Sequence, residues 1–232
     1  MTNDANTRDQ LVLALDVGGL DECEALARKL SAWFATVKVG LELFSESGPE
    51  AVARLRDQGF RVFADLKLHD IPTTVGRAAR VLGRRGVDFL NFHAAGGEAM
   101  LRAGVEGLRE GARESGFGTP IALGVTVLTS DADTSAFDAR LDAARSSGCD
   151  GVVCSGREIA RARAVALRTM VPGVRFAGGG VQDQARVVTP ASAIAAGADW
   201  LVVGRAVTAA PDPVAAAAAL HDEVAAARAG GR

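Results

Sequence analysis

The run FADLKLHDIP places three ionisable residues in and just after an apolar, strand-like segment. Asp65 and Lys67 stand two positions apart, so in an extended strand their side chains project from the same face, and Asp70 follows in the next loop. A lysine between aspartates stays protonated, because nearby opposite charges favour its charged form. Such a lysine can stabilise a developing carbanion and then protonate it. This chemistry suits a decarboxylation and needs no redox group.

Two more charged residues lie near the ends of the preceding apolar runs. Asp16 closes LVLALD, and Lys38 lies late in TVKVG. In a barrel of parallel strands the carboxyl ends of the strands carry the active site, so we expect these residues to share one rim with Asp65 and Lys67. A single buried Asp–Lys pair could equally be a structural ion pair. Charges on the first three strands together favour a functional site.

Glycine-rich segments near the end of the chain predict a phosphate site. Gly178, Gly179 and Gly180 follow the run VRF, and Gly204 with Arg205 follows WLVV. Exposed backbone amides and an arginine favour a phosphate dianion, whereas the alternative is that these glycines only serve tight turns. Their position after the last two predicted strands favours phosphate, because phosphate sites in barrels of this kind lie there.

Two histidines lie near the same rim, His69 between Lys67 and Asp70 and His93 in NFHAAGG. A histidine can act as a general base or can orient the backbone through a hydrogen bond. Because the proposed chemistry needs no second acid or base, we expect structural roles for both.

Eight β-rich runs recur along the chain, separated by stretches with helical spacing of apolar residues. The runs are LVLALD, TVKVG, RVFADLKL, FLNFHAA, PIALGVTVL, GVVCSG, VRFAGG and WLVVGR. Continuous apolar strands alternating with helices indicate a parallel sheet covered by helices. The pattern predicts an α/β protein, a (β/α)8 barrel forming a single domain over residues 1–232, with a polar extension at 1–10. An open doubly wound sheet is the alternative, but its GxGxxG turn is absent after the first run.

The composition limits the partners and the compartment. With 26 basic and 28 acidic side chains, the net charge of −2 offers no general basic field for nucleic acid. The three cysteines form neither a CxxC pair nor a zinc-binding pattern, which indicates a reducing, cytoplasmic setting. The N-terminus lacks the apolar stretch of a signal peptide, and no run is long enough to span a membrane.

In the order of its motifs, the chain resembles the bacterial orotidine 5′-phosphate decarboxylase family over nearly its full length. The matching segments are LALD, VKVG, FADLKLHDIPTTV, TVLTS, DGVVCS, PGVR and LVVGRAVT. A DxKxxD motif alone would be less specific, since related phosphate-binding barrels also use it. The resemblance implies decarboxylation of orotidine 5′-monophosphate to uridine 5′-monophosphate, the last step in making this nucleotide, without a metal or other cofactor.

The resemblance also implies a role for each matching residue at the reacting centre. Lys67 is expected to protonate C6 of the pyrimidine, with Asp65 near the departing carboxylate and Lys38 and Asp70 completing an alternating array of charges. Substrate contacts are expected from Asp16 and Lys38 to the ribose, from Thr129 to the pyrimidine, and from Arg175, Gln184, Gly204 and Arg205 to the phosphate. Family members are homodimers, so Asp70, Ile71 and Thr74 are expected to enter the partner's site.

The sequence departs from the family pattern at Val171, Phe176 and Ala206, where VPGVRF and GRAVT stand for TPGIRP and GRPxT. Phe176 and Ala206 stand where the family has proline, and a loop without proline samples more conformations in its open state. If a loop closes over the phosphate, as the resemblance implies, this closure is the step that we expect to differ.

Two rival functions remain. A Mg²⁺-dependent sugar-phosphate decarboxylase or aldolase of the related barrels would carry a carboxylate where this chain has Lys38, because Mg²⁺ prefers oxygen ligands. A non-catalytic phosphate-binding barrel would have no need for Lys67 between two aspartates.

Overall fold

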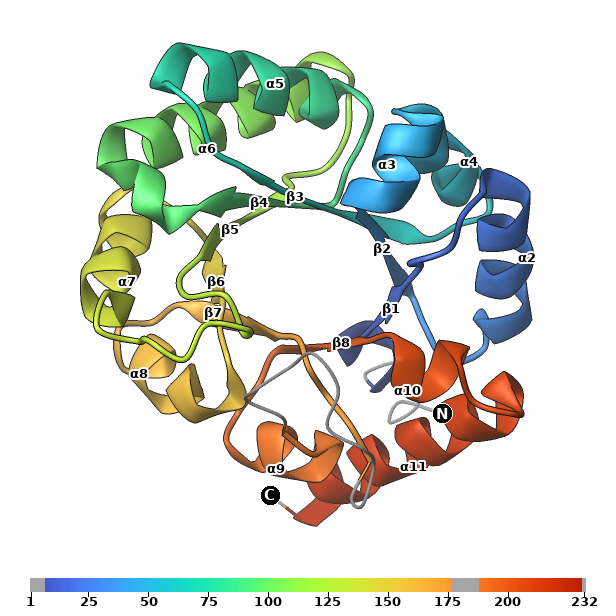
Figure 1. The fold of residues 1–232 in the computed structure, drawn as a ribbon. Helices are drawn as coiled ribbons and strands as arrows, with labels where there is room; N and C mark the ends of the chain where they lie inside the picture. Colours follow the sequence, from blue (N-terminus) through green and yellow to red (C-terminus); the bar gives the residue numbers. More distant parts are fainter. Residues whose placement is uncertain (1–6, 177–187, 231–232) are drawn as a thin grey trace.

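A computed structural model describes residues 7–176 and 188–230, and within them eight parallel strands close into a barrel in sequence order, so the predicted (β/α)8 architecture is confirmed. Figure 1 shows the helices forming a ring around the strands. The strands are β1 (Leu11–Ala14), β2 (Thr36–Gly40), β3 (Arg61–Leu68), β4 (Phe89–His93), β5 (Ile121–Val125), β6 (Gly151–Val153), β7 (Arg168–Val171) and β8 (Trp200–Val203).

Helices connect successive strands, and two short 3₁₀ turns follow β4 and β6. They are α2 (Leu20–Leu30), α3 (Leu41–Ser47), α4 (Glu50–Asp57), α5 (Pro72–Arg84), η1 (Ala94–Gly96), α6 (Gly97–Glu114), α7 (Phe137–Ser146), η2 (Gly156–Glu158), α8 (Ile159–Ala164), α9 (Pro190–Ala195), α10 (Arg205–Thr208) and α11 (Pro213–Gly230). Among the helices of the described residues, none is long and apolar enough to cross a membrane.

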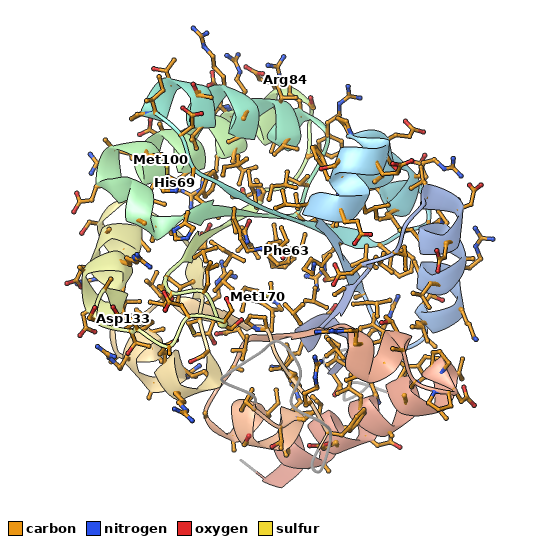
Figure 2. All side chains as sticks on the ribbon, in the orientation of Figure 1. Phe63, His69, Arg84, Met100, Asp133 and Met170 are labelled. Atoms are coloured by element: carbon orange, nitrogen blue, oxygen red, sulfur yellow. The ribbon has the colours of Figure 1, made fainter. Side chains whose placement is uncertain are left out.

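The alternation of side chains along each strand divides the core into two layers. In β1 the outward Leu11 and Leu13 pack under the helices, whereas the inward Val12 belongs to a separate cluster inside the barrel. Figure 2 shows two members of this inner cluster, Phe63 and Met170, projecting into the barrel. This apolar cluster fills the inside of the barrel. The charged residues lie beyond it, at the carboxyl ends of the strands.

The prediction that the seventh strand begins at VRF is wrong. The structure places β7 four residues beyond a short helix, at Arg168–Val171, and Val174 forms only an isolated parallel bridge with Val188. Pro172 has no backbone N–H to donate to a neighbouring strand, so the ladder ends before it. Thr169 is fully buried, and its N–H donates to the Asp199 carboxylate at 2.9 Å. The segment that carries Arg175 is thus part of the connection after β7.

Candidate active site

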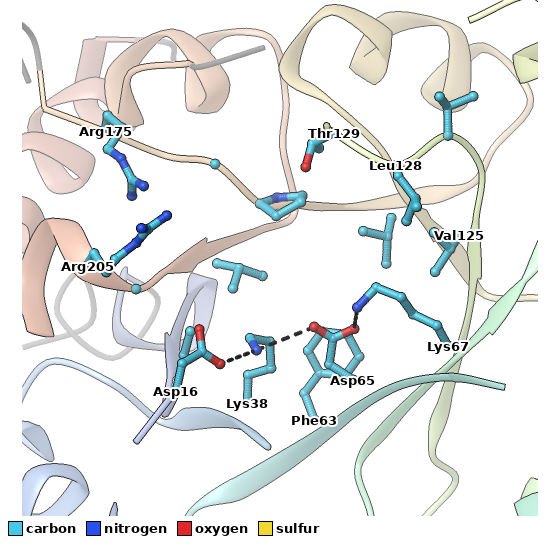
Figure 3. Close-up of a pocket in the computed structure, with 17 residues that line it drawn as sticks. Asp16, Lys38, Phe63, Asp65, Lys67, Val125, Leu128, Thr129, Arg175 and Arg205 are labelled. Carbon is cyan, nitrogen blue, oxygen red and sulfur yellow. Dashed lines mark hydrogen bonds and ion pairs between the residues drawn. The ribbon is translucent and has the colours of Figure 1, made fainter. Parts of the chain in front are cut away.

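A pocket opens at the carboxyl ends of the strands, and its charged lining comes from β2, β3 and the segments that follow β1, β7 and β8 (Figure 3). The charged residues that line it are Asp16, Lys38, Asp65, Lys67, Arg175 and Arg205. In Figure 3 the two arginines lie at one end and Lys67 at the other. The pocket therefore has one end lined by guanidinium groups and another where ammonium and carboxylate groups alternate.

Four side chains form an unbroken chain of alternating charge across the floor of the pocket. Lys38 Nζ lies 2.9 Å from Asp16 Oδ1 and 3.4 Å from Asp65 Oδ2, and Lys67 Nζ lies 2.6 Å from Asp65 Oδ1. Exposure of the side chains rises from 10% at Lys38 and 16% at Asp65 to 33% at Lys67 and 58% at Asp16. Of the two lysines in this row of charges, Lys67 is therefore easier for a bound molecule to reach than Lys38.

The local fold of β2 explains why a lysine can lie inside the barrel. Val37 and Val39 point outward into the core under the helices, which turns Lys38 inward. Above it, Gly40 leaves room for the ion pair: a Cβ atom there would lie 3.0 Å from Lys38 Nζ and 3.2 Å from Asp16 Oδ1. The glycine lets the Lys38–Asp16 contact form without crowding.

The end of β3 is irregular where the two central residues stand. Ala64 pairs with Leu90 and Leu68 with Phe92, so four residues of β3 advance against two of β4. Lys67 takes up this irregularity with φ of 49°, in the left-handed region that side chains rarely adopt. A non-glycine residue held there costs on the order of 1 kcal/mol, and such strain gathers at functional sites. Asp65 keeps its regular pairing with Gly40 of β2, whereas Lys67 reaches the pocket from within the bulge.

Electrostatics keep Asp65 ionised. Burial favours the neutral carboxyl, but the charges of Lys38 and Lys67, together with hydrogen bonds from Lys67 and Asn91, outweigh it and lower the pKa of Asp65 below its ordinary value. An aspartate that stays charged in a half-closed pocket repels a second carboxylate brought beside it. The same negative charge holds the Lys67 ammonium in place.

The opposite end of the pocket is formed by the connections after β7 and β8. Arg175 and Arg205 both line it, and Figure 3 shows their guanidinium groups facing the same space. Gly204 lies between β8 and α10 in this lining. Guanidinium groups bind phosphate oxygens through forked hydrogen bonds. Gln184 and the run Gly178–Gly180 lie outside the described residues.

An uncharged wall connects the two ends. Thr129 lines the pocket beside the apolar side chains of Val125, Val127 and Leu128, which come from β5 and the segment after it. A flat aromatic ring fits between such apolar side chains, and the Thr129 hydroxyl can donate to or accept from its edge.

The structure does not bring Asp70, Ile71 and Thr74 into the pocket of their own chain. All three are exposed at the start of α5, and Ile71 is 65% exposed. Asp70 Oδ1 accepts a hydrogen bond from the N–H of Ile71 at 2.6 Å.

His69 and His93 form a stacked pair outside the pocket, with ring centroids 5.3 Å apart. His93 Nδ1 accepts from the N–H of Ala95 at 3.4 Å, and burial, followed by the charges of His69, Arg140 and Lys67, lowers the pKa of His93. The acceptor nitrogen and the lowered pKa both favour the neutral imidazole of His93.

Sequence reasoning missed Asn91, which contacts both central residues. Its Nδ2 donates to Asp65 Oδ1 at 2.7 Å, and its Oδ1 accepts from the Lys67 N–H at 2.7 Å. The available signal was a polar residue at an inward position of the apolar run FLNFH. An uncharged amide in an apolar strand indicates a functional site less strongly than a charged side chain does.

The three departures from the family pattern lie around the arginine end of the pocket. Val171 is fully buried at the end of β7, and Phe176 and Ala206 are partly buried against the core under the helices. Among the described residues, no group of three or more His, Cys, Asp or Glu side chains is placed to hold a metal ion.

The fold and the pocket define the class: a (β/α)8-barrel protein with a charged small-molecule site at the carboxyl ends of its strands. A model of the "Orotidine 5′-phosphate decarboxylase / HUMPS family" matches residues 9–220. The chain belongs to this family.

Relatives and solved structures agree with this membership. The chain is 46% identical to orotidine 5′-phosphate decarboxylase of Moorella thermoacetica, over 94% of this chain and 93% of that protein. It is 47% identical to the enzyme of the same name from Nitratidesulfovibrio vulgaris, over 94% of this chain and 99% of that protein. The crystal structure of orotidine 5′-phosphate decarboxylase from Lactobacillus acidophilus has a TM-score of 0.80 at 33% identity, covering 93% of this chain and 99% of that one.

Proposed function

We propose that this chain decarboxylates orotidine 5′-monophosphate to uridine 5′-monophosphate and CO2, the last step in making this nucleotide. The observation that carries the proposal is the charged chain Asp16–Lys38–Asp65–Lys67 in the same pocket as Arg175 and Arg205. The names of the relatives support the same substrate.

Lys67 is the acid of the proposed reaction. The bond between C6 of the pyrimidine and the carboxylate carbon breaks, CO2 leaves, and the electron pair stays at C6. The Lys67 ammonium stabilises this charge and then gives C6 its proton, which water later replaces on the lysine. Asp65, ionised beside the substrate carboxylate, raises the energy of the bound ground state, and this repulsion ends when neutral CO2 forms.

The remaining pocket residues hold the nucleotide. Arg175 and Arg205 bind the phosphate together with Gly204 and, by resemblance, Gln184; Thr129 contacts the pyrimidine edge. Asp16 and Lys38 hold the ribose hydroxyls. Binding energy gained at the phosphate, far from C6, is then available to assemble the charged end around the reacting atoms.

A homodimer completes each site in this proposal. Asp70, Ile71 and Thr74 of one protomer enter the pocket of its partner, which agrees with their exposure at the start of α5. Asp70 then adds a negative charge near Lys67 that a single chain does not supply. Cys23, Cys149 and Cys154 are buried and form no disulfide, which fits the reducing cytoplasm as the compartment.

The reaction needs no metal in this proposal, and this separates it from the Mg²⁺-dependent sugar-phosphate enzymes. Lys38 Nζ, between the carboxylates of Asp16 and Asp65, supplies the positive charge that a metal ion would supply in those relatives.

The test is a spectroscopic assay of orotidine 5′-monophosphate, following loss of the orotate absorbance, with excess chelator or with added Mg²⁺. We expect the same turnover in both. Protein carrying Lys67→Ala, purified in the same way, controls for contaminating host enzyme. Turnover that requires Mg²⁺ would favour the sugar-phosphate class instead, and absence of turnover in both conditions would refute the decarboxylase proposal.

A further inference from the structure

Asn91 is a fully buried polar residue that faces the barrel interior in the middle of β4. Its neighbours Leu90 and Phe92 point outward into the core under the helices, and Phe89, two residues earlier, belongs to the inner cluster. Asn91 therefore stands between the apolar interior and the charged pocket. A buried amide in this position needs polar partners, because an unsatisfied one costs about 1 to 3 kcal/mol.

Both ends of the Asn91 amide are used, and each partner is a central residue of the pocket. Oδ1 accepts from the backbone N–H of Lys67 at 2.7 Å, and Nδ2 donates to Asp65 Oδ1 at 2.7 Å. The orientation of the amide follows from this pair, since an ionised carboxylate only accepts and a backbone N–H only donates. One side chain thus fixes the backbone of the lysine and the carboxylate of the aspartate.

The Lys67 backbone needs this support because of the bulge. The regular pairing of β3 with β4 breaks between Ala64 and Leu68, and Lys67 has φ of 49°. Within this break the side chain of Asn91, rather than a strand backbone, accepts the Lys67 N–H. The side chain therefore compensates for a strained conformation that aims the lysine into the pocket.

Asp65 Oδ1 is shared between two donors from different elements. Lys67 Nζ lies 2.6 Å from it, and Asn91 Nδ2 lies 2.7 Å from it, while Lys38 approaches the other oxygen at 3.4 Å. Asn91 therefore fixes the carboxylate plane against which the Lys67 ammonium is held. Moving Asn91 moves both the lysine and its counter-ion.

We propose that Asn91 is a positioning residue for this site: it holds the strained Lys67 backbone and the Asp65 carboxylate in one arrangement, and so sets where the Lys67 ammonium meets the substrate. The inference rests on the proposed decarboxylation and adds a residue to it. Asn91 does not line the pocket and does not take part in bond breaking.

Two variants test this role by different means. Asn91→Ala removes both hydrogen bonds, and we expect turnover to fall on the order of 100-fold, the cost of a misplacement of about 1 Å. Affinity for the product nucleotide should change less than about threefold, because the phosphate contacts lie at the other end of the pocket. The loss should thus appear in kcat and not in product binding.

Asn91→Asp is nearly isosteric and gives a pH signature that a purely structural role would not give. When neutral, the new carboxyl group can donate to Asp65 and accept from the Lys67 N–H; when ionised, it repels Asp65. We expect the ratio of its turnover to that of the unmodified protein to fall as pH rises from about 5 to 8, the direction in which the pair loses its shared proton. The same ratio for Asn91→Ala should not change with pH.

Thr126→Val is the matched control. Thr126 is also fully buried, and its hydroxyl donates to the Val153 carbonyl oxygen at 3.0 Å, outside the charged chain. Its turnover should stay within about threefold of the unmodified protein, as expected for loss of one neutral hydrogen bond away from the reacting atoms.

The outcomes separate this inference from the function on which it rests. Absence of turnover in the unmodified protein would overturn the proposed decarboxylation and the inference with it. Normal turnover in the unmodified protein with Asn91→Ala within about threefold of it, or a pH-independent ratio for Asn91→Asp, would overturn the inference alone. If Asn91→Ala does not fold, the pH dependence of Asn91→Asp decides the question.

Discussion

Lys67 combines a strained backbone with the most exposed ammonium group of the charged chain, so its replacement separates binding from chemistry. We expect Lys67→Ala to bind the product nucleotide nearly as well as the unmodified protein, because Arg175 and Arg205 remain. Turnover should fall by several orders of magnitude, since both the stabilising charge and the proton are lost. Single-turnover kinetics and product titration measure the two effects.

Lys67→Arg separates the charge from the proton. A guanidinium keeps the positive charge but does not release its proton in proteins, so this variant should also be nearly inactive. Turnover of either variant within about tenfold of the unmodified protein would show that another group supplies the proton.

The sequence predicted the charged residues of the pocket but not Asn91, which bonds to two of them. Asp16, Lys38, Asp65 and Lys67 were found because charges on apolar strands need a reason, and the structure brings all four together. Asn91 was missed because the bulge in β3 is not visible in the residue pattern. A regular period of two already placed Asp65 and Lys67 on one face, so nothing indicated that a further side chain was needed.

Among the elements, α5 and α6 pack with their backbones unusually close. Since α5 begins two residues after Asp70, this packing also fixes the segment that carries Asp70. Figure 1 shows the two helices side by side. A Cβ atom at Gly107 of α6 would overlap with the backbone carbonyl oxygen of Gly76 in α5, and one at Gly111 would overlap with that of Arg80. These glycines allow the close approach.

Gly107→Ala should therefore destabilise the protein. Overpacking against α5 should cost about 1 to 3 kcal/mol. Alanine stabilises a helix by about 1 kcal/mol over glycine, so the net loss should be up to about 2 kcal/mol. Urea unfolding measures the change. Because α5 begins just after Ile71, displacement of the helix should also lower turnover in the fraction that stays folded.

Gly230→Ala, at the last residue of α11, is the control for this helix contact. A Cβ atom there would meet nothing within 4 Å, so its effect should stay below about 0.5 kcal/mol. Equal effects of the two substitutions would mean that the α5–α6 contact relaxes without cost.

The seventh strand was predicted in the wrong place because its own sequence is a weak strand signal. The segment RTMV has an arginine and a threonine in its first half and follows a helix rich in arginine and alanine, so it lacks the apolar run of the other strands. Its burial comes from tertiary contacts: Thr169 pairs with Asp199, and the Arg168 guanidinium lies 5.1 Å from the centre of the Trp200 ring. Contacts with β8 and its flanks override the weak local preference.

Across the whole molecule, an apolar cluster fills the inside of the barrel, and some of its members, Phe63 among them, also line the pocket. Phe89 packs edge-on against Phe63 and Trp200, with ring centroids 6.2 and 5.1 Å apart, and fills the interior away from the pocket. The alternation of apolar strands and helices predicted this architecture because both layers of the core depend on it. The residue pattern alone does not predict a surface through which two barrels would associate.

The proposed homodimer makes a prediction about mixed dimers. If Lys67 acts in its own chain and Asp70 in the partner's site, a dimer of one Lys67→Ala chain and one Asp70→Ala chain has one intact site and one doubly damaged site. With different affinity tags on the two chains, the purified mixed dimer should regain about half of the unmodified activity per dimer, although each variant alone is nearly inactive. The assay is turnover of orotidine 5′-monophosphate.

A second mixed dimer, of Lys67→Ala with Asp65→Ala, provides the control, since these two residues lie 2.6 Å apart in one chain and must both come from it. Each of its sites lacks one of them, so it should stay as inactive as either variant alone. Recovery in this pair would mean that the tagged chains exchange or that contaminating enzyme is present. No recovery in the first pair would place Asp70 in the pocket of its own chain, reached by a movement of the loop before α5, and the site would then be complete without a partner.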